Sequence, residues 1–445
     1  MPANLVIWGA PKNTTTDQAM RKVHTFSIII LVVISLHGCN TDVQDQIYLP
    51  AATTLPVHAE LPVALATMEG DEVSTVEAWK DTRKPEIERL FAHYMYGYMP
   101  PPPADIRFKI DAIDENYLDG MAIKKQVTIT FGPANTSFHL LLVIPKDNPD
   151  PAPVFLGPNF HGNHAVLPDE DIPLSDIWQP ERGEGVVDNK ATEASRGTSA
   201  SRWSIDEVIA RGYASATFYH GDLDPDYDNF EDGIHAAMRL EDGSTRDENS
   251  WGSLAAWAYG IHRAVDYLVT DPDIDPDRIA VMGHSRNGKA ALWAGATDER
   301  IALVVSNQSG CGGAALSRRK TGETVQAIND RFPHWFNEAF RHFNDNEDQL
   351  PIDQHLLISL MAPRPVLVAS AEDDKWADPE GEFLALVGAE PVYKLHGKAG
   401  LIVDEMPDLN QLVGAELGYH IRPGGHGVGS QDWGVFMDFA DQFFH

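Results

Sequence analysis

The chain has 445 residues, 43% of them hydrophobic, and a formal net charge of −32 at pH 7. This length allows one large domain with insertions or two small ones. So negative a chain would be repelled by phosphates, which argues against a nucleic-acid partner, and we attribute the charge to a solvated, solubility-promoting surface.

Only two cysteines are present. Cys39 lies in a targeting segment and Cys311 between glycines, so we expect no disulfide and interpret Cys311 as a small buried residue rather than a reactive thiol.

The first 39 residues have the pattern of a bacterial lipoprotein signal. Two positive charges precede a short apolar run, residues 27–36, which is typical of a secretory signal and too short for a membrane span. The following Leu36-His-Gly-Cys39 is similar to a lipobox, so we expect lipid on Cys39 and secretion to the periplasm or outer membrane. Residues 1–19 have the character of sequence upstream of the true start. An ordinary cleaved signal and an uncleaved anchor are the alternatives.

The next part of the chain changes from a polar segment to a helical one. Residues 40–73 are polar, contain proline and have no clear period, which predicts a flexible tether. Apolar residues then recur at helical spacing from Trp79 to Tyr94, which predicts a helix over 74–98. We therefore expect a single catalytic domain over residues 74–445.

Apolar and alternating runs predict strands in the first half of this domain. These runs are residues 107–110, 124–130, 138–144, 154–156 and 213–219, with helices expected at 205–211 and 254–269. The loop Asn159–His164 follows the fourth strand, where a hydrolase supplies a backbone N–H to an oxyanion hole. Its histidines have no carboxylate or cysteine at zinc spacing beside them, so we interpret them as loop polar groups and expect no metal. Residues 168–201 are a polar insertion.

Four aspartates stand close together in the segment that follows residue 221. They are Asp222, Asp224, Asp226 and Asp228. A calcium loop is one interpretation, since carboxylate oxygens are the ligands that calcium takes. We favour the other interpretation, a solvated loop.

The segment from Arg278 to Ala296 predicts a buried strand, a sharp turn and a helix. The turn holds Ser285 between Gly283 and Gly288, which resembles the nucleophile elbow of an α/β-hydrolase, although the second glycine comes one residue later than in G-x-S-x-G. A plain connection is the alternative. A further apolar run at 301–305 fits the next parallel strand. We therefore expect an α/β-hydrolase fold, a mostly parallel sheet between two helical layers.

A serine hydrolase of this fold needs an acid and then a histidine after the nucleophile. His426 lies among glycines before a final amphipathic helix over 433–444, so it can reach the turn as a base. The strand at 365–370 is followed by several carboxylates, where the fold keeps its acid. The candidates are Glu372, Asp373, Asp374 and Asp378.

Several motifs, in the same order, resemble the bacterial glucuronoyl esterases of carbohydrate esterase family 15, from about Trp79 to the C-terminus. They are Gly283-His-Ser-Arg-Asn-Gly-Lys289, Ser306-Asn-Gln-Ser-Gly-Cys-Gly-Gly-Ala-Ala-Leu-Ser-Arg-Arg319, Asn344-Asp-Asn-Glu347, Asp353-Gln-His355, Ala362-Pro-Arg-Pro365 and Trp376-Ala-Asp-Pro379. The resemblance implies hydrolysis of esters of 4-O-methyl-glucuronic acid, the side chain of glucuronoxylan that is joined to lignin alcohols.

The resemblance also implies roles for individual residues. Ser285 matches the nucleophile, His426 the base and Arg286 the oxyanion arginine, while the residues expected to contact substrate are Lys289, Gln308, Glu323 and Trp376. Gln308 stands where many members have the acidic glutamate, so the acid is expected at Asp374, which other bacterial members use. His284 stands where fungal members have a disulfide cysteine.

We therefore expect a lipid-tethered, monomeric serine esterase without cofactor. Two rival hypotheses are another carbohydrate esterase, such as an acetyl xylan esterase, and a non-catalytic glycan-binding lipoprotein. Ser285, Asp374 and His426 in this order argue against the second rival.

Overall fold

The computed structural model describes residues 49–132, 134–242 and 245–444. Within these ranges, no helix is both long enough and apolar enough to cross a membrane. Cys39 and the predicted signal lie outside the described residues.

A ten-stranded sheet runs through the described part of the chain, in the order β1-β2-β3-β7-β4-β8-β9-β10-β12-β11. The six central strands, β7, β4, β8, β9, β10 and β12, are parallel to one another. Antiparallel strands complete both edges. The bounds are β1 Ile106–Tyr117, β2 Ala122–Phe131, β3 Thr136–Pro145, β4 Ala152–Asn159, β7 Ala214–Tyr219, β8 Ile274–His284, β9 Leu303–Asn307, β10 Val366–Ala371, β11 Leu412–Gly414 and β12 Leu417–Arg422. The predicted, mostly parallel sheet is confirmed. The sequence analysis predicted no strand at the position of β12.

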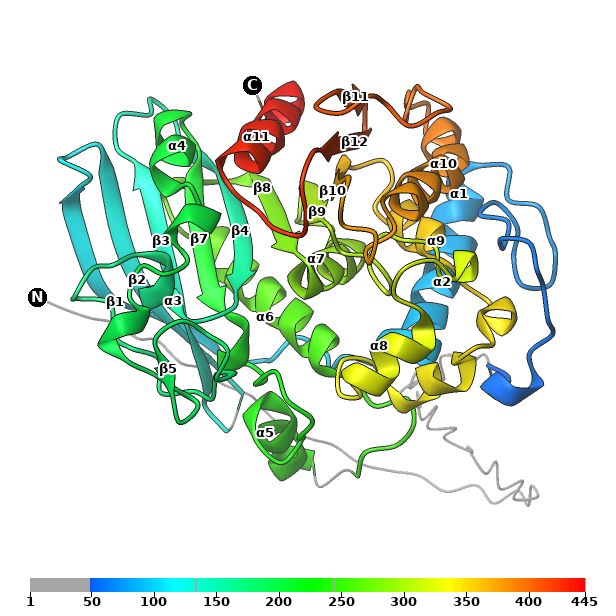
Figure 1. The fold of residues 1–445 in the computed structure, drawn as a ribbon, viewed down its shortest axis with the longest axis horizontal. Coiled ribbons are helices and arrows are strands. Elements are labelled where there is room, and N and C mark those ends of the chain that lie inside the picture. Colours follow the sequence, from blue (N-terminus) through cyan, green and yellow to red (C-terminus); the bar gives the residue numbers. More distant parts are fainter. Residues whose placement is uncertain (1–48, 133, 243–244, 445) are drawn as a thin grey trace, which may run out of the picture. The chain divides into compact units, whose positions relative to one another are not determined.

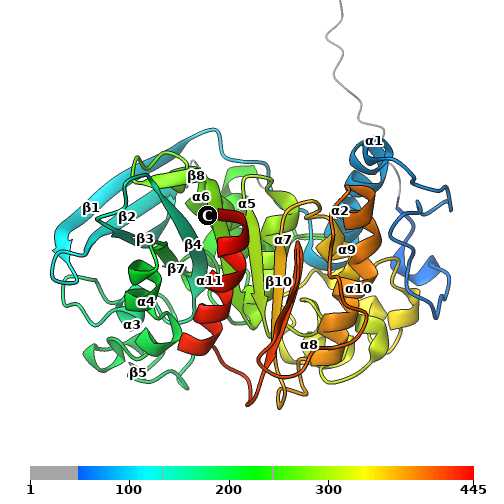
Figure 2. The ribbon, with the colours of Figure 1, turned by 90° about the horizontal axis from the view of Figure 1, so that it is seen from above.

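Helices cover both faces of this sheet (Figures 1 and 2). One face packs against α4 and α11, and the other against α2, α6, α7, α9 and α10. The bounds are α2 Lys84–Phe91, α4 Ile205–Ala210, α6 Ser253–Leu268, α7 Arg286–Thr297, α9 Gln354–Ser359, α10 Pro379–Leu395 and α11 Ser430–Phe444. Along β4, Val154 and Leu156 enter one core and Phe155 the other, because successive side chains of a strand alternate between faces. Burying each stabilises the fold by roughly 1.5–3 kcal/mol.

The segment from residue 49 to 73 corrects the predicted domain boundary. Ala52, Leu55, Ala64 and Val73 are buried in the larger core, and Arg83 donates hydrogen bonds to the carbonyls of residues 63 and 64. The compact unit accordingly begins at Leu49. The prediction of a free tether is therefore wrong from residue 49 onward, because its few apolar residues have no periodicity but still find partners on the domain.

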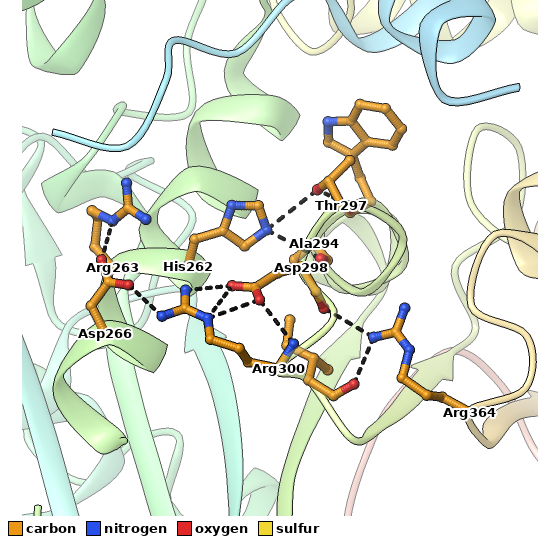
Figure 3. A network of polar contacts seen from close by, with 10 residues as sticks. His262, Arg263, Asp266, Ala294, Thr297, Asp298, Arg300 and Arg364 are labelled. Carbon is orange, nitrogen blue, oxygen red and sulfur yellow. Dashed lines mark hydrogen bonds and ion pairs between the residues drawn. The ribbon is translucent and has the colours of Figure 1, made fainter. Parts of the chain in front are cut away.

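A polar network anchors the C-terminal end of α7 (Figure 3). Arg300 forms ion pairs with Asp298 at 2.6 Å and with Asp266 of α6 at 2.7 Å. Arg364 donates to the backbone carbonyls of Gly295 and Asp298 at the end of the helix, where carbonyls lack intrahelical partners, and to that of Ile301 beyond it. The helix that begins at the Ser285 turn is thus fixed at its far end to α6 and to the approach to β10.

The parallel strands place four segments of the chain at one edge of the sheet. In the register of the sheet, His284 at the end of β8 pairs with Asn307 at the end of β9, and Ala371 at the end of β10 pairs with Arg422 at the end of β12. Residues that follow these strand ends therefore meet at the carboxyl edge, which is where open α/β sheets bind ligands.

Candidate active site

Ser285 forms the turn between β8 and α7. Its φ is +58°, a left-handed conformation that costs an L-residue roughly 1–3 kcal/mol and persists only where surroundings enforce it. Gly283 and Gly288 permit the turn, since a Cβ on Gly283 would lie 2.0 Å from the Asn287 carbonyl oxygen and one on Gly288 2.9 Å from Ser309. The Ser285 N–H donates to the Asn307 carbonyl at 2.9 Å. This geometry exposes the side chain at the start of a helix, as a nucleophile requires.

His426 and Asp374 face each other across the same edge of the sheet. Nδ1 of His426 lies 2.6 Å from Oδ2 of Asp374, whose side chain is 5% exposed, while the imidazole is 44% exposed. A carboxylate at this distance accepts the Nδ1 proton, which leaves Nε2 of the neutral ring as a proton acceptor. Among the four carboxylates that the sequence offered, Asp374 is the one paired with the histidine.

These three residues line one cavity of about 380 Å³. The residues of its wall are Arg182, Ser285, Arg286, Lys289, Gln308, Ser309, Gly310, Glu323, Arg331, Phe332, Trp335, Asp374, Trp376, Ala377 and His426. Every predicted catalytic and substrate-contacting residue is therefore present in a single wall. The volume lies in the range of small-molecule sites.

Arg286 is held in place by a residue of the acidic loop. Its guanidinium forms an ion pair with Asp226 and lies 4.7 Å from the centre of the Trp335 ring. The same carboxylate accepts hydrogen bonds from Trp335 Nε1 at 2.8 Å and His334 Nε2 at 3.0 Å. Burial lowers the pKa of Arg286 to about 9. This value is still above 7, so the group is cationic at neutral pH.

The acidic loop is therefore not the solvated loop that we favoured. Asp224 is fully buried, accepts a hydrogen bond from Ser253, and offers its backbone carbonyl to Trp257 Nε1 at 2.8 Å. Asp222 accepts the backbone N–H of His139. Within the described residues, no group of His, Cys, Asp or Glu side chains could hold a metal ion. The carboxylates of Asp222, Asp224 and Asp226 bond to other protein groups and that of Asp226 reaches the site, whereas Asp228 is exposed.

Comparison with known proteins identifies the family. The family model "Glucuronyl esterase, fungi" matches residues 243–397. A carbohydrate esterase from an unknown prokaryotic organism is 50% identical over 86% of this chain and 89% of its own length. A solved structure that is 48% identical to this chain is described as a family 15 carbohydrate esterase. The chain belongs to carbohydrate esterase family 15.

Further proteins resemble this chain in structure or in sequence. The glucuronoyl esterase of Solibacter usitatus is 41% identical, with a TM-score of 0.82 over 88% of this chain and all of that one. A promiscuous family 15 esterase from a marine bacterial metagenome is 48% identical, with a TM-score of 0.81 over 88% of this chain and 98% of that one. The 4-O-methyl-glucuronoyl methylesterase of Neurospora crassa is 29% identical over 76% of this chain and 73% of its own length. The predicted α/β-hydrolase fold is thereby confirmed.

In this family 15 chain, Lys289 lies within the wall rather than at its surface. It is 3% exposed, and its ammonium donates to the carbonyls of Ser309 at 2.5 Å and Cys311 at 2.6 Å. Burial lowers its pKa, and Glu323 lies 3.8 Å away. An ammonium has three donors, so the contacts with two carbonyls leave one for a ligand. Cys311 is buried as predicted, and burial raises the pKa of its thiol.

Two further predicted residues lie at opposite depths of the cavity. Trp376 is 50% exposed and offers an aromatic face at the rim. Gln308 is 1% exposed, and its side-chain amide is bound to the backbone of Gly427. The amide of Gln308 is therefore already engaged by the protein.

Among the residues of the site that sequence reasoning missed, three are charged. Arg182 and Arg331 line the cavity, and their charges contribute to the lowered pKa of Arg286. Within the described ranges, neither guanidinium has a carboxylate partner. Asp226 was noted only as one acid of four. Arg182 lies in the insertion at 168–201 and Arg331 ends the helix α8, Val325–Arg331. Neither arginine carries a sequence signal of its own, so only the fold brings these charges together.

Proposed function

We propose that the chain is a glucuronoyl esterase, which hydrolyses esters of glucuronic acid and 4-O-methyl-glucuronic acid such as those that join glucuronoxylan to lignin alcohols. The observation that carries the proposal is the cavity that combines Ser285, His426 and Asp374 with the basic side chain of Arg286. Family membership supports the same chemistry, since relatives with glucuronoyl esterase names match most of the chain.

The geometry supports an acyl-enzyme mechanism. Ser285 Oγ attacks the ester carbonyl carbon while Nε2 of His426 takes its proton, and Asp374 stabilises the imidazolium through Nδ1. The oxyanion of the tetrahedral intermediate faces Arg286 and the N–H groups at the start of α7. The intermediate collapses by expelling the alcohol, which receives the proton from Nε2. Water then repeats the sequence on the acyl-enzyme and releases the uronate.

The other residues of the wall suit a sugar. Lys289 offers a donor and Glu323 acceptors to sugar hydroxyls, and the exposed ring of Trp376 can pack on the sugar or the alcohol. No cofactor is needed for this reaction.

The deciding experiment is hydrolysis of benzyl and methyl glucuronate by the wild type and by Ser285→Ala. We expect turnover in the wild type, none in the variant, and sugar binding retained by both, because the substitution removes only the attacking oxygen. Turnover by Ser285→Ala within about tenfold of wild type would contradict the assignment, since losing a nucleophile costs far more.

A broader ester specificity is the second candidate, because a solved relative at 48% identity is described as promiscuous. Acetylated xylan and 4-nitrophenyl acetate, assayed beside the glucuronate esters, separate the two. A higher kcat/KM for acetylated xylan would favour an acetyl esterase.

We also propose that the protein is exported and lipid-anchored at Cys39, and acts as a monomer. The signal-like run and the lipobox-like residues support the anchor. Cys39→Ser should release the protein from membranes and change its processing, whereas unchanged membrane association would contradict the proposal.

A further inference from the structure

Gln308 adopts a conformation that a glutamine rarely takes. It directly follows β9 with a φ of +51°, and it is 1% exposed. A left-handed conformation costs an L-residue with a side chain roughly 1–2 kcal/mol, so the surroundings must hold it. Its backbone N–H does so by donating to the Ala369 carbonyl of β10 at 2.8 Å.

The strained backbone directs the Gln308 amide at the residue after the catalytic histidine. Oε1 accepts the Gly427 N–H at 2.8 Å, and Nε2 donates to the Gly427 carbonyl at 2.9 Å. Both polar atoms of the amide are thus bonded to the backbone of one residue, as in a hydrogen-bonded pair of antiparallel strands. An amide fits this arrangement because it offers one donor and one acceptor side by side.

The segment that receives these two bonds needs an external hold. Gly424, Gly425, Gly427 and Gly429 surround His426, and glycine loses more conformational freedom on ordering than any other residue. Arg422 Nη2 and Asn307 Nδ2 also donate to the Gly427 carbonyl, at 2.8 Å and 3.2 Å. The Gly427 N–H is bound by Gln308, so Gln308 holds the two peptide units on either side of the Gly427 Cα.

We propose that Gln308 is a positioning residue for ester hydrolysis: its amide clamps Gly427 and so holds the His426 imidazole between Asp374 and Ser285. This inference rests on the proposed function. It assigns Gln308 a role through the backbone of the histidine loop rather than the substrate contact that the family resemblance implied.

The clamp accounts for an amide, rather than a carboxylate, at this position. A glutamate would keep the acceptor for the Gly427 N–H but would place a second oxygen against the Gly427 carbonyl oxygen. It would also bring a second negative charge close to Asp374, which lines the same cavity. Both effects would disturb the loop that carries His426.

The test compares Gln308→Met with Gln308→Glu, using benzyl glucuronate. Methionine keeps the length of the side chain and removes both hydrogen bonds, whereas glutamate keeps one. We expect Gln308→Met to lower kcat by about 10- to 100-fold, because small misplacements of reacting groups have costs of this size. KM should stay within about twofold, since no substrate contact is lost. Gln308→Glu should lower kcat as well.

The control is Gln126→Met on β2. The Gln126 amide also donates to a backbone carbonyl, that of Asp171 at 3.2 Å, but it lies outside the wall of the catalytic cavity. We expect kcat and KM of Gln126→Met to equal those of the wild type. This control measures any loss of activity that comes from replacing a glutamine in general.

Wild-type kcat in either folded Gln308 variant would overturn the clamp, as would a raised KM at unchanged kcat, which is the signature of a substrate contact. If Gln308→Met does not fold, Gln308→Glu alone decides by the same criteria. Hydrolysis of 4-nitrophenyl acetate separates failure of the clamp from failure of the proposed function, because it reports His426 action without a uronate. If the enzyme cleaves 4-nitrophenyl acetate but no glucuronate ester, the proposed function fails. The kcat values of the Gln308 variants on the acetate then decide whether the clamp exists.

Discussion

The ends of β9 and β10 are neighbours in the sheet, and each is followed by a polar residue that reaches the histidine loop. After β10, Asp374 binds the His426 imidazole at 2.6 Å. After β9, Gln308 binds the Gly427 backbone through both atoms of its amide. The charged Asp374 contacts the imidazole ring, and the neutral Gln308 contacts the backbone beside it. Residues from two strand ends therefore orient the base together. The comparison shows that the position after β9, where Gln308 stands in place of a glutamate, can be uncharged and still contribute to the site.

The largest effect should come from removing the charge after β10. Asp374→Asn should lower kcat for benzyl glucuronate by at least about a hundredfold with the fold intact, because the imidazolium loses its counter-charge and the ring its correct tautomer. Circular dichroism checks the fold. Substitutions of Glu372, Asp373 and Asp378 serve as controls and should cost little. A fast Asp374→Asn beside a crippled Glu372 or Asp378 variant would refute the assignment to Asp374.

A smaller effect should come from a charge that lies outside both strand ends. Asp226→Asn should lower kcat by about tenfold, since the Arg286 guanidinium loses the carboxylate that fixes it. The free energy of unfolding should fall by roughly 3 kcal/mol, because a buried cation is left without its partner. Denaturant titration and steady-state kinetics measure both. Unchanged kcat with the expected loss of stability would leave Asp226 a purely structural residue.

The smallest effect concerns the carboxyl that bridges the two strand ends. Glu382 accepts the Gly310 N–H at 2.9 Å beyond β9 and the Ser370 hydroxyl at 2.6 Å on β10. Burial raises its pKa to about 8, whereas an unfolded glutamate has a pKa of about 4.3. The folded protein therefore keeps a proton that the unfolded chain releases between these values, and stability falls as pH rises through that window.

Glu382→Gln should remove this loss and flatten the pH dependence of Tm. Between pH 5 and pH 8, the Tm of the variant should rise by roughly 4 °C relative to that of the wild type. Thermal unfolding across this range tests it. A difference in Tm between variant and wild type that does not change with pH would mean that Glu382 is ionised in the folded state.

The sequence predicted those parts of the site that depend on local pattern. The strand, turn and helix around Ser285 follow from an apolar run, two glycines and helix-forming residues, and His426 from a glycine-rich loop before an amphipathic helix. Asp374 needed the family resemblance, because four carboxylates follow β10 and spacing alone does not choose among them.

The parts that escaped prediction depend on contacts between distant segments. Asp226 lies 60 positions before Arg286, and nothing in its acid-rich surroundings distinguishes it from Asp228. The packing of residues 49–73 also depends on a surface that later residues build, with the His58 N–H donating to the Asp348 carbonyl at 2.7 Å. The role of Gln308 follows from where β9 ends relative to β12, a strand that the sequence did not reveal.

The division between the two strand ends is tested most directly by the His426 Nδ1–H proton, observed by NMR in histidine-labelled protein. A short hydrogen bond to a carboxylate shifts such a proton far downfield. We expect the signal in the wild type, its loss in Asp374→Asn, and its survival in Gln308→Met with faster exchange with water. A downfield signal that persists in Asp374→Asn and vanishes in Gln308→Met would contradict the account, because the ring would then be oriented by Gln308 and not by Asp374.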